Sequence, residues 1–287
     1  MAPLLLVLMS AAALVAAAAR WSISPTTAPT SARLAAVHRQ TQAWLWAGLG
    51  TGVVLAVLAL TTSTLGRGVL IAAPLLALGI LTGVSVGQLR AQAPDGPVRT
   101  AGLTPRGTFD RLPKRLTMGV VPATGLLAVV LAFTTAVGGP DDLGRSGRAL
   151  LRRCGASAQS HSPWPGSFYS IRLGSVVLTG LVIAAYALHR VALRPNQGED
   201  SLADDSLRAA AARSVTAAFG LLVSLPLVGV LLLTASGLLS TSCRPAWWTV
   251  LGTVLLLLTP LLLALAAWCA ACLISPTRQP APSTHAR

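Results

Sequence analysis

Seven long apolar stretches dominate this chain, and none has Asp, Glu, Lys or Arg in its core. In lipid, a helix satisfies its own backbone hydrogen bonds, and about 20 apolar residues cross the roughly 30 Å of hydrocarbon. We therefore predict an all-α, polytopic transmembrane bundle. Its seven spans are expected at about 3–19, 43–62, 69–88, 117–137, 173–190, 214–236 and 247–273, with a disordered cytoplasmic tail at 276–287.

Composition and tryptophan placement support this class. Only 10% of the residues are charged, against about 25% in soluble domains. All seven Trp residues lie near a predicted span end, where indole rings favour the headgroup level. The net charge of +14 sits in the connecting loops. Because no nucleic-acid motif accompanies it, we expect contact with anionic lipid headgroups and no binding of nucleic acid.

The distribution of bases predicts the orientation. With the first connecting loop inside, the inner side carries fifteen bases and the outer side seven, which favours N-out and C-in. The outer loop at about 138–172 is the exception, because it carries five Arg residues. The first segment could instead be a cleaved signal peptide, since Ala17 and Ala19 form an A-x-A pattern. Met1-Ala2-Pro3 lacks a basic n-region, so we expect a retained helix.

Two inner loops, at about 89–116 and 191–213, hold many of the bases. Ser201 and Asp204 form a capping-box pattern before an Ala-rich run that could lead without a break into span six, with Asp204 and Arg208 one turn apart. We interpret both loops as solvated or headgroup-bound connections. The first is the basic inner loop, with Arg90, Arg99, Arg106, Arg111, Lys114 and Arg115.

The first inner loop also carries a resemblance. It contains Gly96-Pro97-Val98-Arg99-Thr100-Ala101, Leu103-Thr104-Pro105-Arg106 and Leu112-Pro113-Lys114-Arg115. These motifs resemble the inner loop of a group of uncharacterised actinobacterial integral-membrane proteins, over spans two to four. The resemblance implies a membrane location and no known activity. Arg supplies 21 of the 22 strong bases, a bias typical of GC-rich actinobacterial genomes, so we expect the cell membrane of such a bacterium.

Cys154 and Cys243 lie in two loops that charge counting places outside. An oxidising outer face permits a disulfide between them, which would add roughly 2–4 kcal/mol of stability. The alternatives are two free thiols or bonds to another chain. The sequence leaves these open, because it does not place the two Cα atoms within the required ~7 Å.

Cys269-Ala-Ala-Cys272 is a CxxC motif, which raises the alternative of a membrane thiol–disulfide enzyme. From Trp247 to Cys269 a helix extends about 33 Å. We therefore expect the motif on the opposite side of the bilayer from Cys154 and Cys243. It also does not lie at the start of a helix, the position at which the helix dipole would lower a thiol pKa. We expect both thiols to be small packing residues.

Glycines at four-residue spacing predict close helix packing. Gly79, Gly83 and Gly87 form GxxxGxxxG in span three, and Gly48 and Gly52 form a shorter version in span two. Glycines four apart share a helix face and let another backbone approach. The partner helix could belong to this chain or to another subunit. We favour internal packing.

No catalytic constellation, metal site or cofactor motif is evident. Our leading hypothesis is a non-enzymatic accessory or structural membrane subunit, with other membrane subunits as partners. The alternative is a transporter or permease subunit for an apolar or weakly polar solute, with Thr82, Ser85 and Thr124 lining a mid-membrane site. That alternative rests on prolines that would kink the spans, at Pro74, Pro122, Pro226 and Pro260.

Overall fold

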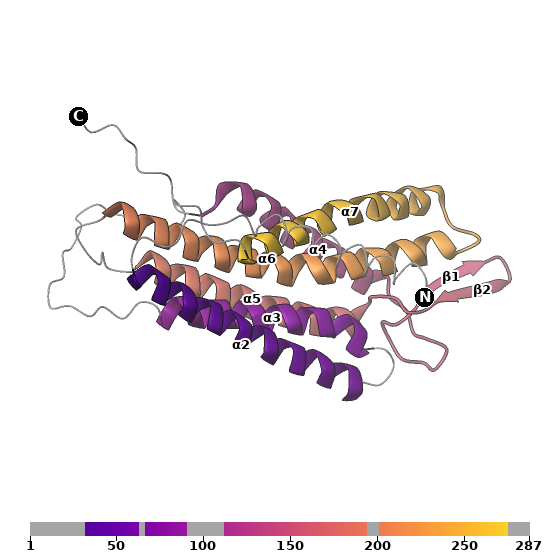
Figure 1. Cartoon of the computed structure of the whole chain (residues 1–287). Helices are drawn as coiled ribbons and strands as arrows, with labels where there is room; N and C mark the ends of the chain where they lie inside the picture. The colour runs from indigo at the N-terminus through magenta and orange to yellow at the C-terminus, as the bar shows by residue number, and fades with distance from the viewer. Residues whose placement is uncertain (1–31, 63–66, 91–111, 194–200, 275–287) are drawn as a thin grey trace.

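The computed structural model describes residues 32–62, 67–90, 112–193 and 201–274, whose regular structure is helical apart from one small β-hairpin (Figure 1). All six helices have segments long and apolar enough to cross a membrane, so this is a multi-pass membrane fold. The predicted span at 3–19 and the tail at 276–287 lie outside the described residues. The elements are α2 (Ala32–Thr62), α3 (Arg67–Arg90), α4 (Lys114–Val137), β1 (Leu150–Cys154), β2 (Ser157–His161), α5 (Ser167–Ala192), α6 (Ser201–Ser240) and α7 (Ala246–Ile274).

The helices lie roughly side by side, so their ends gather at the two ends of one bundle (Figure 1). The β-hairpin and the turn between α6 and α7 lie at the same end. We call this the hairpin end, and it comprises residues 138–166 and 241–245. The opposite end holds the start of α6 and the end of α5 (Figure 1).

α6 is the central helix, because it contacts α3, α4, α5 and α7. Most of its candidate span Leu207–Ser240 is buried, whereas the other five candidate spans are mostly not buried within the protein. A helix that is apolar on every side suits this position. A glycine on α6 lets α4 and α7 pack closely against it, since a methyl group at Gly220 would lie 2.5 Å from Cys269 Sγ and 2.9 Å from Val120 Cγ2. The core is therefore built around α6.

α2 lies at the edge of the bundle and packs mainly on α3. A methyl group at Gly79 would lie 2.5 Å from Gly52 Cα and 2.6 Å from Gly48 O, and one at Gly48 would lie 2.7 Å from Gly83 Cα. Gly87 lies against α2 one turn further along. All five glycines that the sequence singles out therefore meet in one contact inside this chain, where two backbones approach closely.

The connection between α4 and α5 differs from the prediction. We expected an outer loop over about 138–172, but α5 begins at Ser167 and a hairpin occupies part of the connection. We had placed Arg172 in the loop, because charged residues are rare within transmembrane spans. In the structure its Nη1 reaches back along the helix to Phe168 O at 2.9 Å. A long side chain near a helix end can keep its charge at the interface in this way.

The start of α6 also differs from the prediction. The helix runs from Ser201 without a break, as the capping pattern had allowed, and its candidate span begins at Leu207. The expected span at 214–236 lies inside this longer helix. The residues just before it are packed in the bundle and do not form a solvated connection, because Arg208 is only 2% exposed and Ala211 and Ala212 are buried. Contacts with other helices bury this turn of α6, and no local sequence pattern predicts such contacts. The side chain of Asp204 is not described, so its predicted pairing with Arg208 stays a prediction.

Candidate functional site

The hairpin end is the candidate functional site, because polar side chains with defined partners gather there. The disulfide and the Arg148–Asp141 ion pair both lie at this end. Across the described ranges, no group of three or more His, Cys, Asp or Glu side chains could hold a metal ion. The geometry of the hairpin end therefore bears most directly on function.

The hairpin has two faces of different character. β1 and β2 pair antiparallel through a two-residue turn, in which Gly155 has a φ of +63°. Glycine adopts this conformation readily, and such turns favour it. Leu150 opposes His161 and Arg152 opposes Gln159, and side chains alternate along each strand. The more buried face carries Leu150, Arg152, Cys154, Gln159 and His161, and the exposed face carries Leu151, Arg153, Ala158 and Ser160.

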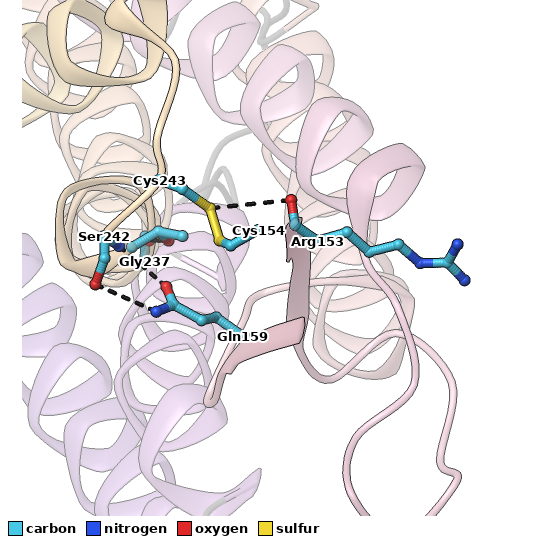
Figure 2. The surroundings of a disulfide bond; sticks show 7 residues. Arg153, Cys154, Gln159, Gly237, Ser242 and Cys243 are labelled. Atoms are coloured by element: carbon cyan, nitrogen blue, oxygen red, sulfur yellow. Dashed lines mark hydrogen bonds between the residues drawn. A yellow bond between two sulfur atoms is a disulfide. The ribbon is translucent and has the colours of Figure 1, made fainter. Parts of the chain in front are cut away.

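The buried face is fastened to the turn between α6 and α7. The structure joins Cys154 and Cys243 in a disulfide, with Cα atoms 5.9 Å apart. Beside it, Gln159 Nε2 donates to Ser242 Oγ at 3.2 Å, and the Ser242 backbone N–H donates to Gln159 Oε1 at 3.0 Å (Figure 2). Cys243 Sγ also lies 3.9 Å from Arg153 O. One covalent bond and two hydrogen bonds thus tie both strands to a segment about 90 residues away.

His161 fastens the end of β2 to α6. Its Nδ1 lies 2.9 Å from Ser240 Oγ, and its ring packs where Gly237 has no side chain. Burial lowers the pKa of His161 below its ordinary value of 6.5, because an apolar environment disfavours the charged form. The imidazole is therefore neutral at pH 7 and serves as a hydrogen-bonding partner.

Trp164 anchors the chain between the hairpin and α5. It is fully buried, its ring lies against Gly237, and its Nε1–H donates to Thr134 O at 2.8 Å. Its backbone N–H donates to Arg148 O at 2.9 Å. A buried indole with its N–H satisfied gives a large apolar contact without an unpaired donor. The side chain therefore links α4 with α6, and the backbone links both to the segment that leads into β1.

Asp141 organises the turn that leads into the hairpin. Its carboxylate accepts hydrogen bonds from the backbone N–H groups of Arg145 at 2.8 Å and Leu143 at 3.1 Å, and from Arg148 Nη1 at 2.7 Å. The bond from Arg145, with the bond from Leu143 and the positive charge of Arg148, holds the pKa of Asp141 below its ordinary value. The carboxylate is therefore ionised at any physiological pH.

Two arginines of this segment lie against aromatic rings. The Arg148 guanidinium lies 4.7 Å from the centre of the Phe168 ring, and the Arg152 guanidinium lies 5.4 Å from that of Trp248. Arg148 is also paired with Asp141. Each ring offers its negative face to a cation. Two guanidinium groups, those of Arg148 and Arg152, therefore lie within the hairpin end against aromatic rings.

The basic inner loop is described only in part. Arg90 and Lys114 lie at the ends of α3 and α4, and Arg115 follows Lys114. The Arg90 guanidinium lies 4.3 Å from the centre of the Trp44 ring. Arg99, Arg106 and Arg111 lie outside the described residues.

The CxxC cysteines belong to the packing of the bundle. Cys269 is fully buried against Gly220, and Cys272 Sγ accepts a hydrogen bond from Arg213 Nη2 at 3.3 Å. Cys269 follows the start of α7 by about 35 Å of helix. The structure therefore does not bring it together with Cys154 and Cys243.

The three hydroxyls proposed for a transport site have different surroundings. Thr82 is exposed and donates to Leu78 O at 2.8 Å, and Thr124 donates to Val120 O at 2.8 Å, both within their own helices. Ser85 is buried, and its hydroxyl has no partner within the described part of the chain. The threonine hydroxyls are thus satisfied locally, and Ser85 is not.

Sequence reasoning singled out the two cysteines but missed the hairpin and the other residues that fasten it. A signal was present, because Gly155-Ala156 separates two short runs, which is the spacing of a two-residue hairpin turn. Gln159, His161 and Trp164 had no such signal, since their partners lie on other elements. Only the folded chain shows what they bind.

No known family, curated protein or solved structure matches this chain. The resemblance of the first inner loop to uncharacterised membrane proteins therefore stays an expectation. The function has to be argued from the geometry.

Proposed function

We propose that this chain is a non-enzymatic accessory subunit of a cell membrane, and that its hairpin end contacts a partner protein outside the membrane. The observation that carries the proposal is the fastening of the hairpin. A two-stranded hairpin is at best marginally stable alone. Here a disulfide and side-chain hydrogen bonds from β2 hold it in one position on the bundle.

The length of the connection supports this role. Helices of a bundle are ordinarily joined by about 2–8 residues, whereas residues 138–166 separate α4 from α5. Longer connections with their own structure are usually functional, because a rigid scaffold positions the loops that bind partners. A simple link between two helices would need neither the hairpin nor its fastening.

The exposed face supports one kind of partner. Leu143 and Leu151 are exposed apolar side chains, and Arg145 and Arg153 are exposed bases of the same segment. A partner surface that combines acidic and apolar side chains fits this face. We propose anionic lipid headgroups as the partner of the bases at the opposite end, including Arg190.

The role needs the hairpin end to face outward, so we propose N-out and C-in. The disulfide supports this orientation, because such bonds persist in oxidising compartments. Single cysteines at the exposed positions Ser146 and His189 would report the two ends of the bundle. A membrane-impermeant maleimide should label intact cells at position 146 and not at position 189. The reverse pattern would refute the orientation.

Site-specific photocrosslinking tests the role itself. A photoreactive residue in place of Leu151 samples the exposed face of the hairpin, and one in place of Leu178 on α5 samples an exposed position within the span. In native membranes, position 151 should give one protein adduct of defined mass, and position 178 should give lipid adducts. Charge reversal by Arg153→Glu should weaken the adduct at position 151.

A matched control is the reversal Arg39→Glu at the start of the α2 span, which should leave the adduct unchanged. Equal adducts from positions 151 and 178, or none from position 151, would remove the accessory role.

The transporter alternative has one observation in its favour. Ser85, Thr216 and Ser224 are buried, and their hydroxyls have no hydrogen-bond partner in the described ranges. A buried hydroxyl without a partner is costly, and polar groups within spans often mark solute paths. Solute flux into proteoliposomes that falls in Ser224→Ala would favour this alternative. Equal flux with and without the protein would end it.

A further inference from the structure

We propose an oxyanion-binding site between β1 and the first turn of α7, where Arg152 and Trp248 bind a phosphate group. The proposal goes beyond the accessory role and does not depend on it. Arg152 lies on the inner face of the hairpin, and its guanidinium is 5.4 Å from the centre of the Trp248 ring. The two side chains are thus in contact at the junction of β1 and α7.

Both side chains carry a buried hydrogen-bond donor. Trp248 is only 4% exposed, and Arg152 is partly buried. The buried Nε1–H of Trp248 and the buried Nε–H of Arg152 both lack an acceptor among the described residues. Indole and guanidinium nitrogens donate and do not accept, so neither can satisfy the other. A buried donor without an acceptor costs about 1–3 kcal/mol, and two such donors on neighbouring side chains point to an acceptor from outside the chain.

The charge of Arg152 also differs from that of the neighbouring Arg148 in its surroundings. Arg148 has Asp141 at 2.7 Å as its counterion. Arg152, four residues further along the same segment, has no carboxylate partner in the part of the chain that the structure describes. A partly buried charge is ordinarily paired. The missing partner of Arg152 is therefore an anion.

The shape of the guanidinium and its place at a helix start indicate the class of anion. The planar fork of a guanidinium binds two oxygens at once, which suits phosphate. Trp248 lies in the first turn of α7, and the positive end of the helix dipole favours an anion there. The exposed Trp247 beside it is typical of the headgroup level of a membrane. The phosphate can therefore come from a lipid headgroup or from free inorganic phosphate.

Indole NMR of the full chain in dodecyl maltoside tests the site, because this detergent contains no phosphate. The seven tryptophans give seven indole N–H signals, and Trp248→Phe identifies the one from Trp248 while keeping a ring in place. Sodium phosphate should shift that signal saturably, whereas sodium chloride at the same ionic strength should not. A parallel titration with dihexanoyl phosphatidylglycerol measures the affinity for a lipid phosphate. Saturation at the lower concentration shows which source is preferred.

Arg152→Gln should weaken the apparent affinity tenfold or more, which is the size of effect that a charge-assisted contact gives. Arg153→Gln is the matched control, because it removes the same charge from the next residue, whose side chain points away from the disulfide (Figure 2). Its affinity should stay within about twofold of the parent. The other six indole signals report whether each variant is folded. No shift of the Trp248 signal with either phosphate source, or equal affinities for the two variants, would overturn the proposal.

Discussion

The glycine contact between α2 and α3 gives a quantitative prediction for Gly79→Ala. The added methyl group would lie 2.5 Å from Gly52 Cα and 2.6 Å from both Gly48 O and Gly52 N. These are backbone atoms, so no side chain can rotate away, and the two helices have to separate by about 1 Å to restore ordinary contact. Because Gly83 shares the same contact, the separation loosens more than one turn.

Overpacking of this kind costs about 1–3 kcal/mol, and backbone neighbours place Gly79→Ala at the upper end. Alanine regains up to about 1 kcal/mol through its greater helix propensity. We therefore expect a net destabilisation of about 2 kcal/mol. The loss should be local, because α2 packs mainly on α3 and contributes little to the core around α6.

Two measurements check the Gly79→Ala prediction. Thermal unfolding in detergent reports the loss of stability. Distances between spin labels at the exposed positions Gln40 on α2 and His189 on α5 report the movement of α2. The variant should broaden that distance distribution toward longer values.

Gly50→Ala is the matched control, because it makes the same substitution on α2 at a position with no atom within 4 Å of the added methyl group. It should be neutral or slightly stabilising. Equal stability losses for Gly50→Ala and Gly79→Ala would refute the reasoning.

Three further predictions concern the hairpin end. Replacing Cys154 and Cys243 together by Ser should lower the free energy of unfolding by about 2–4 kcal/mol, and a reductant should destabilise the parent but not this double variant. Asp141→Asn should destabilise the protein at pH 7. Since the folded pKa of Asp141 lies below its ordinary value of 3.8, that difference in melting temperature should shrink as the pH falls below 3.8; a constant difference would contradict it. Trp164→Phe leaves the Thr134 carbonyl without its donor and should cost about 1–3 kcal/mol by thermal unfolding, whereas Trp46→Phe at an exposed position should cost little.

Some features followed from the sequence because their causes are local. The six described spans coincide with long apolar runs to within a few residues, except at the starts of α5 and α6. Both exceptions involve an arginine, because Arg172 and Arg208 lie within helices whose predicted spans begin too late in the sequence. Arg172 reaches a nearby carbonyl, and Arg208 is covered by the folded bundle. A charge therefore marks the end of a span only where no such contact exists.

The glycine and cysteine patterns predicted which residues make close contacts or a disulfide, but they did not predict the partners of those residues. Spacing of four placed Gly79 and Gly83 on one helix face, but two possible partners remained until the structure put Gly48 and Gly52 of the same chain against them. The same holds for Cys154, whose pairing with Cys243 depends on a distance across 89 residues of sequence.

Hydrocarbon imposes one local rule, that each crossing segment must be long, apolar and helical. The sequence by itself therefore determined which of the described segments are helices long and apolar enough to cross a membrane. Only the tertiary structure decided that α6 lies at the centre, which face of the hairpin turns inward, and that Arg148 has a carboxylate partner while Arg152 has none among the described residues. These outcomes depend on contacts between residues far apart in the chain. Such contacts have no fixed spacing, so no local pattern encodes them.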